Sequence, residues 1–267
     1  MQLLEPLVPD PRAWLARANP VAKLGAAVVL MVAAFVAVDI VTPAILVTVL
    51  MTALPGAGLR AGALAGRLWP LGVAAVGVGL LNALLADDPT GTLLWQLGLL
   101  VLTTGSLIDG VALALRLLAI ALAGVLSFVA TDPTELTDAL VQQLHVSPRL
   151  AVGGLAGARA LPILAEEWQA IGLARRARGV DAGRSPTAAA RLFGGRMLAL
   201  LVRAVRRGVR MAAAMEARGF GTADCRTVAR AQRMHGRDWA LLIGAALVAV
   251  AATAFSMSIG SWRFIFG

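Results

Sequence analysis

Charged residues are scarce in this 267-residue chain: they make up only 15% of it, whereas hydrophobic residues make up 59%. A soluble domain is usually nearer one quarter charged and half apolar. Surface-to-volume scaling leaves one water-soluble core too little interior for so many apolar side chains. The composition therefore argues against an ordinary soluble domain and indicates a protein embedded in a bilayer.

Residues that carry catalysis or bind metals are also nearly absent. Cys225 is the only cysteine, so no disulfide within the chain is possible. His145 and His235 lie far apart without a partner at ligand spacing, which favours surface or interface histidines over a metal site. No Ser/His/Asp set can be assembled within the apolar segments, and no glycine-rich loop of the Walker type is present. We therefore expect no catalytic, metal or cofactor-binding residues in this chain.

The basic residues are unevenly distributed along the chain, which carries a formal charge of +9. Five apolar stretches predict membrane-spanning helices, about the length that a bilayer needs: 21–38, 40–54, 68–86, 108–130 and 239–257. The apolar stretch 93–102 is too short to cross and is interpreted as interfacial or re-entrant. With the N-terminus in the cytoplasm, the inner segments 1–23, 55–67 and 131–238 hold 3, 2 and 17 of the 24 Lys and Arg residues. This asymmetry follows the positive-inside rule, so a membrane-tethered nucleic-acid binder, which rests on charge alone, is disfavoured.

The long inner segment 131–238 should have structure of its own, because unstructured loops of that length are uncommon in compact proteins. Three pairs of a capping residue and a proline mark helix starts in it: Asp132-Pro133, Ser147-Pro148 and Ser185-Pro186. They predict helices over about 133–144, 148–178 (with Pro162 as a kink) and 186–218. The same device at Asp10-Pro11 and Asn19-Pro20 predicts a short interfacial helix bearing Trp14 and the start of the first span.

The third of these helices is strongly amphipathic, with one apolar and one basic stripe at helical spacing. The apolar stripe is Leu198, Leu201, Val202, Val205 and Val209, and the basic stripe is Arg196, Arg203, Arg207 and Arg210. Such a helix lies along a membrane or a partner and does not cross the bilayer. The basic stripe could contact anionic lipid, an acidic protein surface, or both. Glu166 and Glu167 lie on an arginine-rich helix, where ion pairing is favoured over acid–base work.

Both long inner helices end in the same tripeptide, Ala177-Arg178-Gly179 and Ala217-Arg218-Gly219. One interpretation is structural: an arginine complements the helix dipole and a glycine ends the helix. The other is functional, because two occurrences at equivalent ends carry more weight than one. Small neighbours let a partner approach closely, and the planar guanidinium can then fork onto carbonyls or carboxylates.

Four stretches resemble the transmembrane coupling subunit, or T component, of energy-coupling factor transporters, a branch of the ABC importers. They are 19–24 (Asn-Pro-Val-Ala-Lys-Leu), 131–136 (Thr-Asp-Pro-Thr-Glu-Leu), 177–179 and 214–220 (Ala-Met-Glu-Ala-Arg-Gly-Phe). The last is the most specific, and Arg116 also stands where the family tends to place an arginine. Asn19 and Ala22 depart from the aspartate and threonine of the family pattern.

The resemblance implies a division of labour. Arg178 and Arg218 would each dock into a groove on one of two cytoplasmic ATPase subunits, with Ala177, Gly179, Ala217 and Gly219 permitting close approach. The apolar faces of the coupling helices would support a separate small membrane-embedded subunit that binds a vitamin or a transition-metal ion. The chain itself would not hydrolyse ATP, and it would lie in the cell membrane with several spans.

We therefore expect an all-α membrane protein in three parts: a transmembrane region 1–130, a cytoplasmic coupling region 131–238, and a C-terminal span with its tail, 239–267. The alternative is a self-contained secondary transporter or channel. Few polar groups within the spans and no inverted repeat speak against it. Arg116, the one intramembrane charge, is a functional candidate by default, and it could instead snorkel or pair with a helix end.

Overall fold

The computed structural model describes residues 13–58, 61–85, 92–97, 100–181, 183, 185–220, 228 and 230–260. The chain divides into two compact units, one formed by Met1–Ala139 with Gln232–Gly267 and the other by Leu140–Ala231. Each is described by itself below. The assignment of the three expected parts to membrane and cytoplasm stays a prediction.

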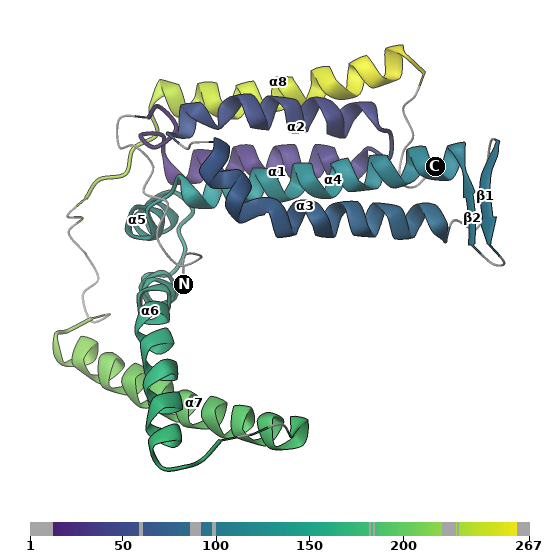
Figure 1. Ribbon diagram of the computed structural model, residues 1–267. Helices are drawn as coiled ribbons and strands as arrows, with labels where there is room; N and C mark the ends of the chain where they lie inside the picture. Colours follow the sequence, from purple (N-terminus) through teal and green to yellow (C-terminus); the bar gives the residue numbers. More distant parts are fainter. Residues whose placement is uncertain are drawn as a thin grey trace. The chain divides into compact units, whose positions relative to one another are not determined.

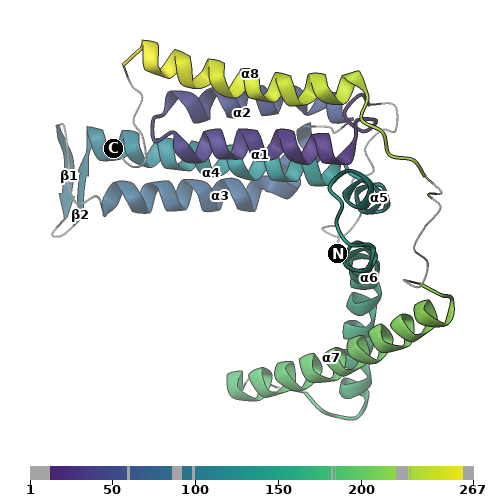
Figure 2. The ribbon, with the colours of Figure 1, turned by 180° about the vertical axis from the view of Figure 1, so that it is seen from behind.

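The first unit is a bundle of apolar helices that run side by side (Figures 1 and 2). Its elements are α1 (Pro20–Val36), α2 (Val41–Ala53), the short 3-10 helix η2 (Pro55–Ala57), α3 (Ala61–Leu84), α4 (Thr104–Val129), the start of α5 (Pro133–Gln143), and α8 (Gly236–Ser258). All five stretches predicted to span the membrane are helical, and the predicted all-α class is confirmed. Helix α3 begins about two turns before the predicted residue 68.

Among the described helices, α4 and α8 are long and apolar enough to cross a membrane. Pro20–Val36, Val41–Ala53 and Leu68–Leu84 are shorter apolar helices. Three alanines and a leucine from four helices form one buried cluster: Ala34 of α1, Leu46 of α2, Ala119 of α4 and Ala252 of α8. The core is thus built where alanines allow close helix packing.

The stretch interpreted as interfacial or re-entrant forms two antiparallel strands, β1 (Leu93–Leu97) and β2 (Leu100–Thr103). This hairpin leads directly into α4, whose first turn is capped reciprocally by Thr103 and Ser106. The run of leucine with valine and tryptophan suits a strand as well as a helix, and it is too short for periodicity to decide between them.

The second unit contains two long helices, α6 (Pro148–Ala177) and α7 (Pro186–Ala217), which cross one another (Figure 1). The predicted starts at Pro133, Pro148 and Pro186 are confirmed. Their capping chemistry is confirmed in two of three cases. Asp132 accepts from the backbone N–H groups of Thr134 and Glu135, and Ser185 accepts from that of Ala188.

The third capping prediction was wrong: Ser147 makes no side-chain capping bond, and α6 starts there on proline alone. At the N-terminus, Asp10-Pro11 lies outside the described residues, and Trp14 sits in a single turn instead of a short helix. Asn19 caps α1 as predicted, accepting from the Val21 N–H at 2.9 Å.

Candidate functional site

The end of α6 is a Schellman motif built around the first Ala-Arg-Gly. The Val180 N–H donates to the Arg175 carbonyl at 3.0 Å, and the Gly179 N–H donates to that of Arg176 at 2.9 Å. Arg178 occupies the cap position, with φ −92° and ψ 12°. Gly179 has φ +72°, a left-handed conformation that glycine adopts without the steric cost of a Cβ.

The end of α7 repeats this geometry closely. The Phe220 N–H donates to the Met215 carbonyl at 3.0 Å, and the Gly219 N–H donates to that of Glu216 at 2.9 Å. Arg218 is the cap residue, with φ −89° and ψ 9°, and Gly219 has φ +74°. The shared tripeptide therefore encodes the same local structure twice. The structural interpretation of the glycines is confirmed, and it leaves the role of the arginine side chains open.

Arg178 and Arg218 are exposed, and no hydrogen bond or ion pair joins either guanidinium to another described residue. The two ends are also well separated. With a rise of 1.5 Å per residue, the helix crossing near Gly172 and Gly195 lies about 9 Å from Arg178 and about 35 Å from Arg218. The Cα atoms of the two arginines are therefore at least roughly 25 Å apart, so the two helix ends form two separate sites.

The crossing of α6 and α7 is built from two arginines and two glycines in reciprocal positions. The Arg175 Nη1 donates to the Leu192 carbonyl at 3.0 Å. Its guanidinium covers Gly195, where an added Cβ would meet Nη1 at 3.0 Å. In the same way the Arg196 guanidinium covers Gly172, where an added Cβ would meet Nη1 at 3.2 Å. Each glycine makes room for the arginine of the other helix.

Two further contacts flank this crossing. Trp168 and Phe193 pack edge to face, with ring centroids 5.3 Å apart at an interplanar angle of 68°. Arg207 pairs with Glu167 across the helices at 3.4 Å, with both side chains partly exposed. Glu167 is thus an ion-pair partner, as the sequence indicated. An exposed pair of this kind contributes up to about 1 kcal/mol.

The predicted apolar stripe on α7 is exposed along its length. The stripe residues have exposed fractions between 43% and 64%, and they are Leu198, Leu201, Val202, Val205 and Val209. No residue of α7 is buried. Contiguous apolar surface of this kind marks an interaction site with protein or membrane. The basic stripe is less uniform than expected, because Arg196 and Arg207 contact α6 whereas Arg203 and Arg210 are exposed.

In the first unit, the motif 19–24 joins three helix ends. The Lys23 side chain is 3% exposed, and its Nζ donates to the Ala130 carbonyl at 2.6 Å and to that of Ala16 at 3.0 Å. The ammonium therefore satisfies a carbonyl at the C-terminus of α4, where helix carbonyls have no partner within the helix.

Asp238, at the start of α8, completes this cluster. It is 3% exposed, and its two carboxylate oxygens accept from the backbone N–H groups of Asn19 and His235, each at 2.7 Å. The starts of α1 and α8 are thus tied to one carboxylate. Hydrogen bonds to a charged group are the stronger ones, worth about 1.5–3 kcal/mol each.

Arg116, which the sequence predicted to lie within a membrane span, pairs with a helix end. Its Nε donates to the Ala34 carbonyl at 3.0 Å, and the guanidinium lies 5.1 Å from the ring centroid of Phe35. Ala34 belongs to the last turn of α1, so the arginine satisfies a carbonyl that lacks a helical partner. Of the two structural roles considered from the sequence, pairing with a helix end is the one observed.

Sequence reasoning missed Asp238, Gly172 and Gly195. Asp238 could have been suspected as an acidic residue in the first turn of an apolar helix. Nothing in the sequence distinguishes Gly172 and Gly195 from the other glycines, because their role depends on a helix 23 residues away along the chain.

The chain matches the family described as CbiQ, cobalt transport protein, over residues 11–229. It is 31% identical over 184 residues to the energy-coupling factor transporter transmembrane protein EcfT of Bacillus subtilis, covering 66% of this chain and 68% of that one. The EcfT proteins of Lacticaseibacillus paracasei and Listeria innocua are 35% and 33% identical to it. They align with 56% and 59% of this chain and with 60% and 63% of their own lengths, so this chain spans a little under two thirds of these two relatives.

Proposed function

Because the chain belongs to the CbiQ family and is the transmembrane T component of an energy-coupling factor transporter, we propose that it couples two cytoplasmic ABC ATPase subunits to a separate membrane-embedded substrate-binding subunit. The chain itself is a non-catalytic subunit. The ATPase subunits supply ATP hydrolysis, and the substrate-binding subunit supplies specificity for a vitamin or a transition-metal ion.

The two Ala-Arg-Gly ends are the docking points for the ATPase subunits. Arg178 and Arg218 share the same cap geometry, are exposed, and have no described side-chain partner. This repeated geometry is the observation that carries the proposal. A guanidinium on a rigid helix end is pre-organised to fork onto backbone carbonyls or carboxylates of a groove.

The small residues beside each arginine allow that approach. Ala177 and Ala217 precede the arginines, and Gly179 and Gly219 follow them, so neither arginine has a bulky neighbour in the sequence. The separation of the two arginines, at least roughly 25 Å, exceeds what one groove could span and fits one docking point for each ATPase subunit.

The exposed apolar stripe of α7 supports the substrate-binding subunit. That subunit is itself a membrane protein, and an apolar helix face of this length is the complement it needs. Movement of α6 and α7, driven at their ends by the ATPase subunits, would then reach the substrate-binding subunit through the stripe.

The chain crosses the cell membrane several times, with α1, α2, α3, α4 and α8 as the spans and the N-terminus in the cytoplasm. The distribution of arginines and the apolar character of these helices support this topology. The division into 1–130, 131–238 and 239–267 follows from it, with the middle part on the cytoplasmic side. The partners are then the two ATPases, the substrate-binding subunit and the lipid bilayer, without nucleic acid.

The test is co-purification of the tagged chain from its native membrane in mild detergent. We expect two ATPase subunits, or one ATPase as a pair, together with a small hydrophobic protein. The double variant Arg178→Glu/Arg218→Glu should lose the ATPase subunits while inserting normally. Each single variant should lose one docking point and leave a partial complex.

A matched control has the same change of charge at other exposed arginines of α7, namely Arg191→Glu/Arg210→Glu. It should retain the ATPase subunits. Normal association of the Arg178→Glu/Arg218→Glu chain would refute the docking assignment. Purification of the wild-type chain alone, or only with itself, would favour a self-contained transporter or channel.

A further inference from the structure

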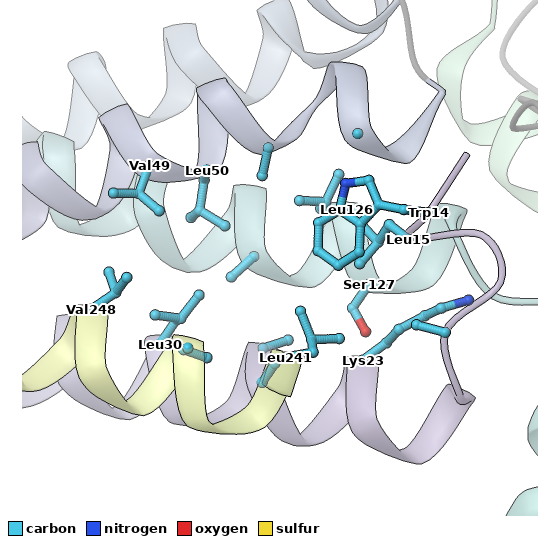
Figure 3. Close-up of a pocket in the computed structure, with 18 of the residues that line it drawn as sticks. Trp14, Leu15, Lys23, Leu30, Val49, Leu50, Leu126, Ser127, Leu241 and Val248 are labelled. Atoms are coloured by element: carbon cyan, nitrogen blue, oxygen red, sulfur yellow. The ribbon is translucent and has the colours of Figure 1, made fainter. Parts of the chain in front are cut away.

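A groove of about 720 Å³ runs into the first unit between α2 and α8, over α1 and α4 (Figure 3). At one end of these helices, α2 and α8 are joined because Ser256 donates to the buried Asp39 carboxylate at 2.7 Å. The groove lies toward their other end, along the second half of α2 and the first half of α8. It is therefore at the end of the bundle that holds Lys23 and Asp238.

The walls of the groove are almost entirely apolar. Figure 3 shows side chains from all four helices around it, among them Leu30, Leu50, Leu126, Leu241 and Val248. Gly244 of α8 also lines it, and an added Cβ there would meet nothing within 4 Å. A volume of this size with an apolar lining is within the usual range of a binding site for an apolar molecule.

At one end of the groove the lining residues are basic instead of apolar. Arg17, Lys23 and Arg237 belong to the lining, and none of the described residues that line the groove is acidic. Lys23 donates to two carbonyls, and Arg17 and Arg237 lie at the exposed surface. Trp14 packs its indole directly on Gly56 at the same end, which suits the tryptophan position at a membrane–water interface. The groove thus has apolar walls along most of its length and a positively charged rim at one end.

One polar group interrupts the apolar wall. Ser127 lines the groove, is 5% exposed, and its Oγ makes no hydrogen bond to any described residue. Leaving a buried hydroxyl without a partner costs about 1–3 kcal/mol. An acceptor on a bound molecule, such as an ester carbonyl, would recover part of this cost. Ser127 lies in the last turn of α4, near the level of Lys23 (Figure 3).

We propose that this groove binds one anionic phospholipid. Its acyl chain lies along the leucines and valines, an ester carbonyl accepts from Ser127, and its phosphate pairs with Arg17 and Arg237. The charge of the rim selects an anionic over a zwitterionic headgroup, because basic pockets between membrane helices attract anionic lipid. The proposal depends on the chain being a membrane protein and not on the docking of ATPase subunits.

The test is native mass spectrometry of the chain, purified both alone and in its transporter complex, after exchange into phosphatidylglycerol or phosphatidylcholine. We expect one tightly held phosphatidylglycerol for each copy of this chain. Gly244→Leu, which places a side chain into the empty space of the groove, should remove it. Gly77→Leu is the control, because Gly77 lies on α3 outside the groove and also has open space at its Cβ position.

Arg17→Gln/Arg237→Gln should keep a bound lipid but lose on the order of 25-fold in its preference for phosphatidylglycerol over phosphatidylcholine, since each basic group near an anionic headgroup contributes about fivefold. This variant leaves the walls unchanged, so it tests the proposal even if Gly244→Leu disturbs packing. Retention of phosphatidylglycerol by Gly244→Leu, or an unchanged preference in the double variant, would overturn the proposal. So would lipid that binds the isolated chain but is absent from the complex, which would assign the groove to a protein partner.

Discussion

The two units of this chain differ in how much of their helix surfaces is buried against other helices. In the first unit, helices bury alanines against one another along their lengths, and eight residues of α4 are buried. In the second, α7 has no buried residue, and α6 and α7 meet around one crossing. A unit that hides its helix faces gains stability from them, whereas a unit that exposes them keeps surface for partners. The difference suits a membrane anchor joined to a coupling device.

Glycines show this contrast most directly. In the first unit, an added Cβ at Gly110 would collide with the Gly79 carbonyl, and one at Gly79 would collide with the Gly110 carbonyl. In the second unit, an added Cβ at Gly172 or Gly195 meets only the tip of an arginine. Backbone cannot move aside without separating the helices, but a guanidinium can swing away. The same substitution should therefore have different consequences in the two units.

The largest effect is expected for Gly110→Leu. The side chain must push α3 away from α4, and overpacking of this kind costs up to about 3 kcal/mol. For a chain of this size that corresponds to a fall of roughly 5–10 °C in the apparent Tm, measured by thermal unfolding in detergent. Gly77→Leu on α3 is the control, since its Cβ position is open, and it should change the Tm little. Equal Tm values for the two variants would contradict the close α3–α4 contact.

An intermediate effect is expected for Asp238→Ala, which tests the helix ends and not the helix faces. It removes the carboxylate that accepts hydrogen bonds from the backbone N–H groups of Asn19 and His235. The bond from Asn19 is buried. We expect a loss of about 2 kcal/mol, because the buried bond from Asn19 is worth about 1.5–3 kcal/mol and water can replace the carboxylate at the part-buried His235 N–H. Asp238→Asn keeps one acceptor oxygen and should lose less. If both variants matched the wild type in apparent Tm, the carboxylate would not be holding α1 and α8 together.

The sequence predicted local features of both units well and long-range ones poorly. The helices α1, α6 and α7 each begin at a proline that directly follows Asn19, Ser147 or Ser185. Two adjacent residues are therefore enough to predict each helix start. The strands β1 and β2 were missed, because short apolar runs do not distinguish strand from helix. The early start of α3 was missed because the prediction followed the apolar stretch, which begins only after Arg67.

The candidate site divides in the same way. The two Ala-Arg-Gly ends could be located from the sequence, because a glycine after the last helical residue encodes the Schellman motif locally. The bond between Asp238 and Asn19 joins residues 219 positions apart, and the arginine–glycine crossing joins two helices. Contacts of this kind depend on tertiary packing, which cannot be predicted from the few residues around each position in the sequence.

The smallest effect is expected for Gly172→Ala and Gly195→Ala. A new methyl group needs the neighbouring guanidinium to move by only a few tenths of an ångström, and alanine favours the helix over glycine by about 0.8–1.0 kcal/mol. The two terms nearly cancel, so each variant should stay within about 0.5 kcal/mol of the wild type by apparent Tm. Arg175→Ala, which also removes the bond to the Leu192 carbonyl, should cost about 1 kcal/mol. If Gly172→Ala were instead as damaging as Gly110→Leu, the crossing of α6 and α7 would be a rigid contact like those of the first unit. The two coupling helices would then be fixed against each other at this point.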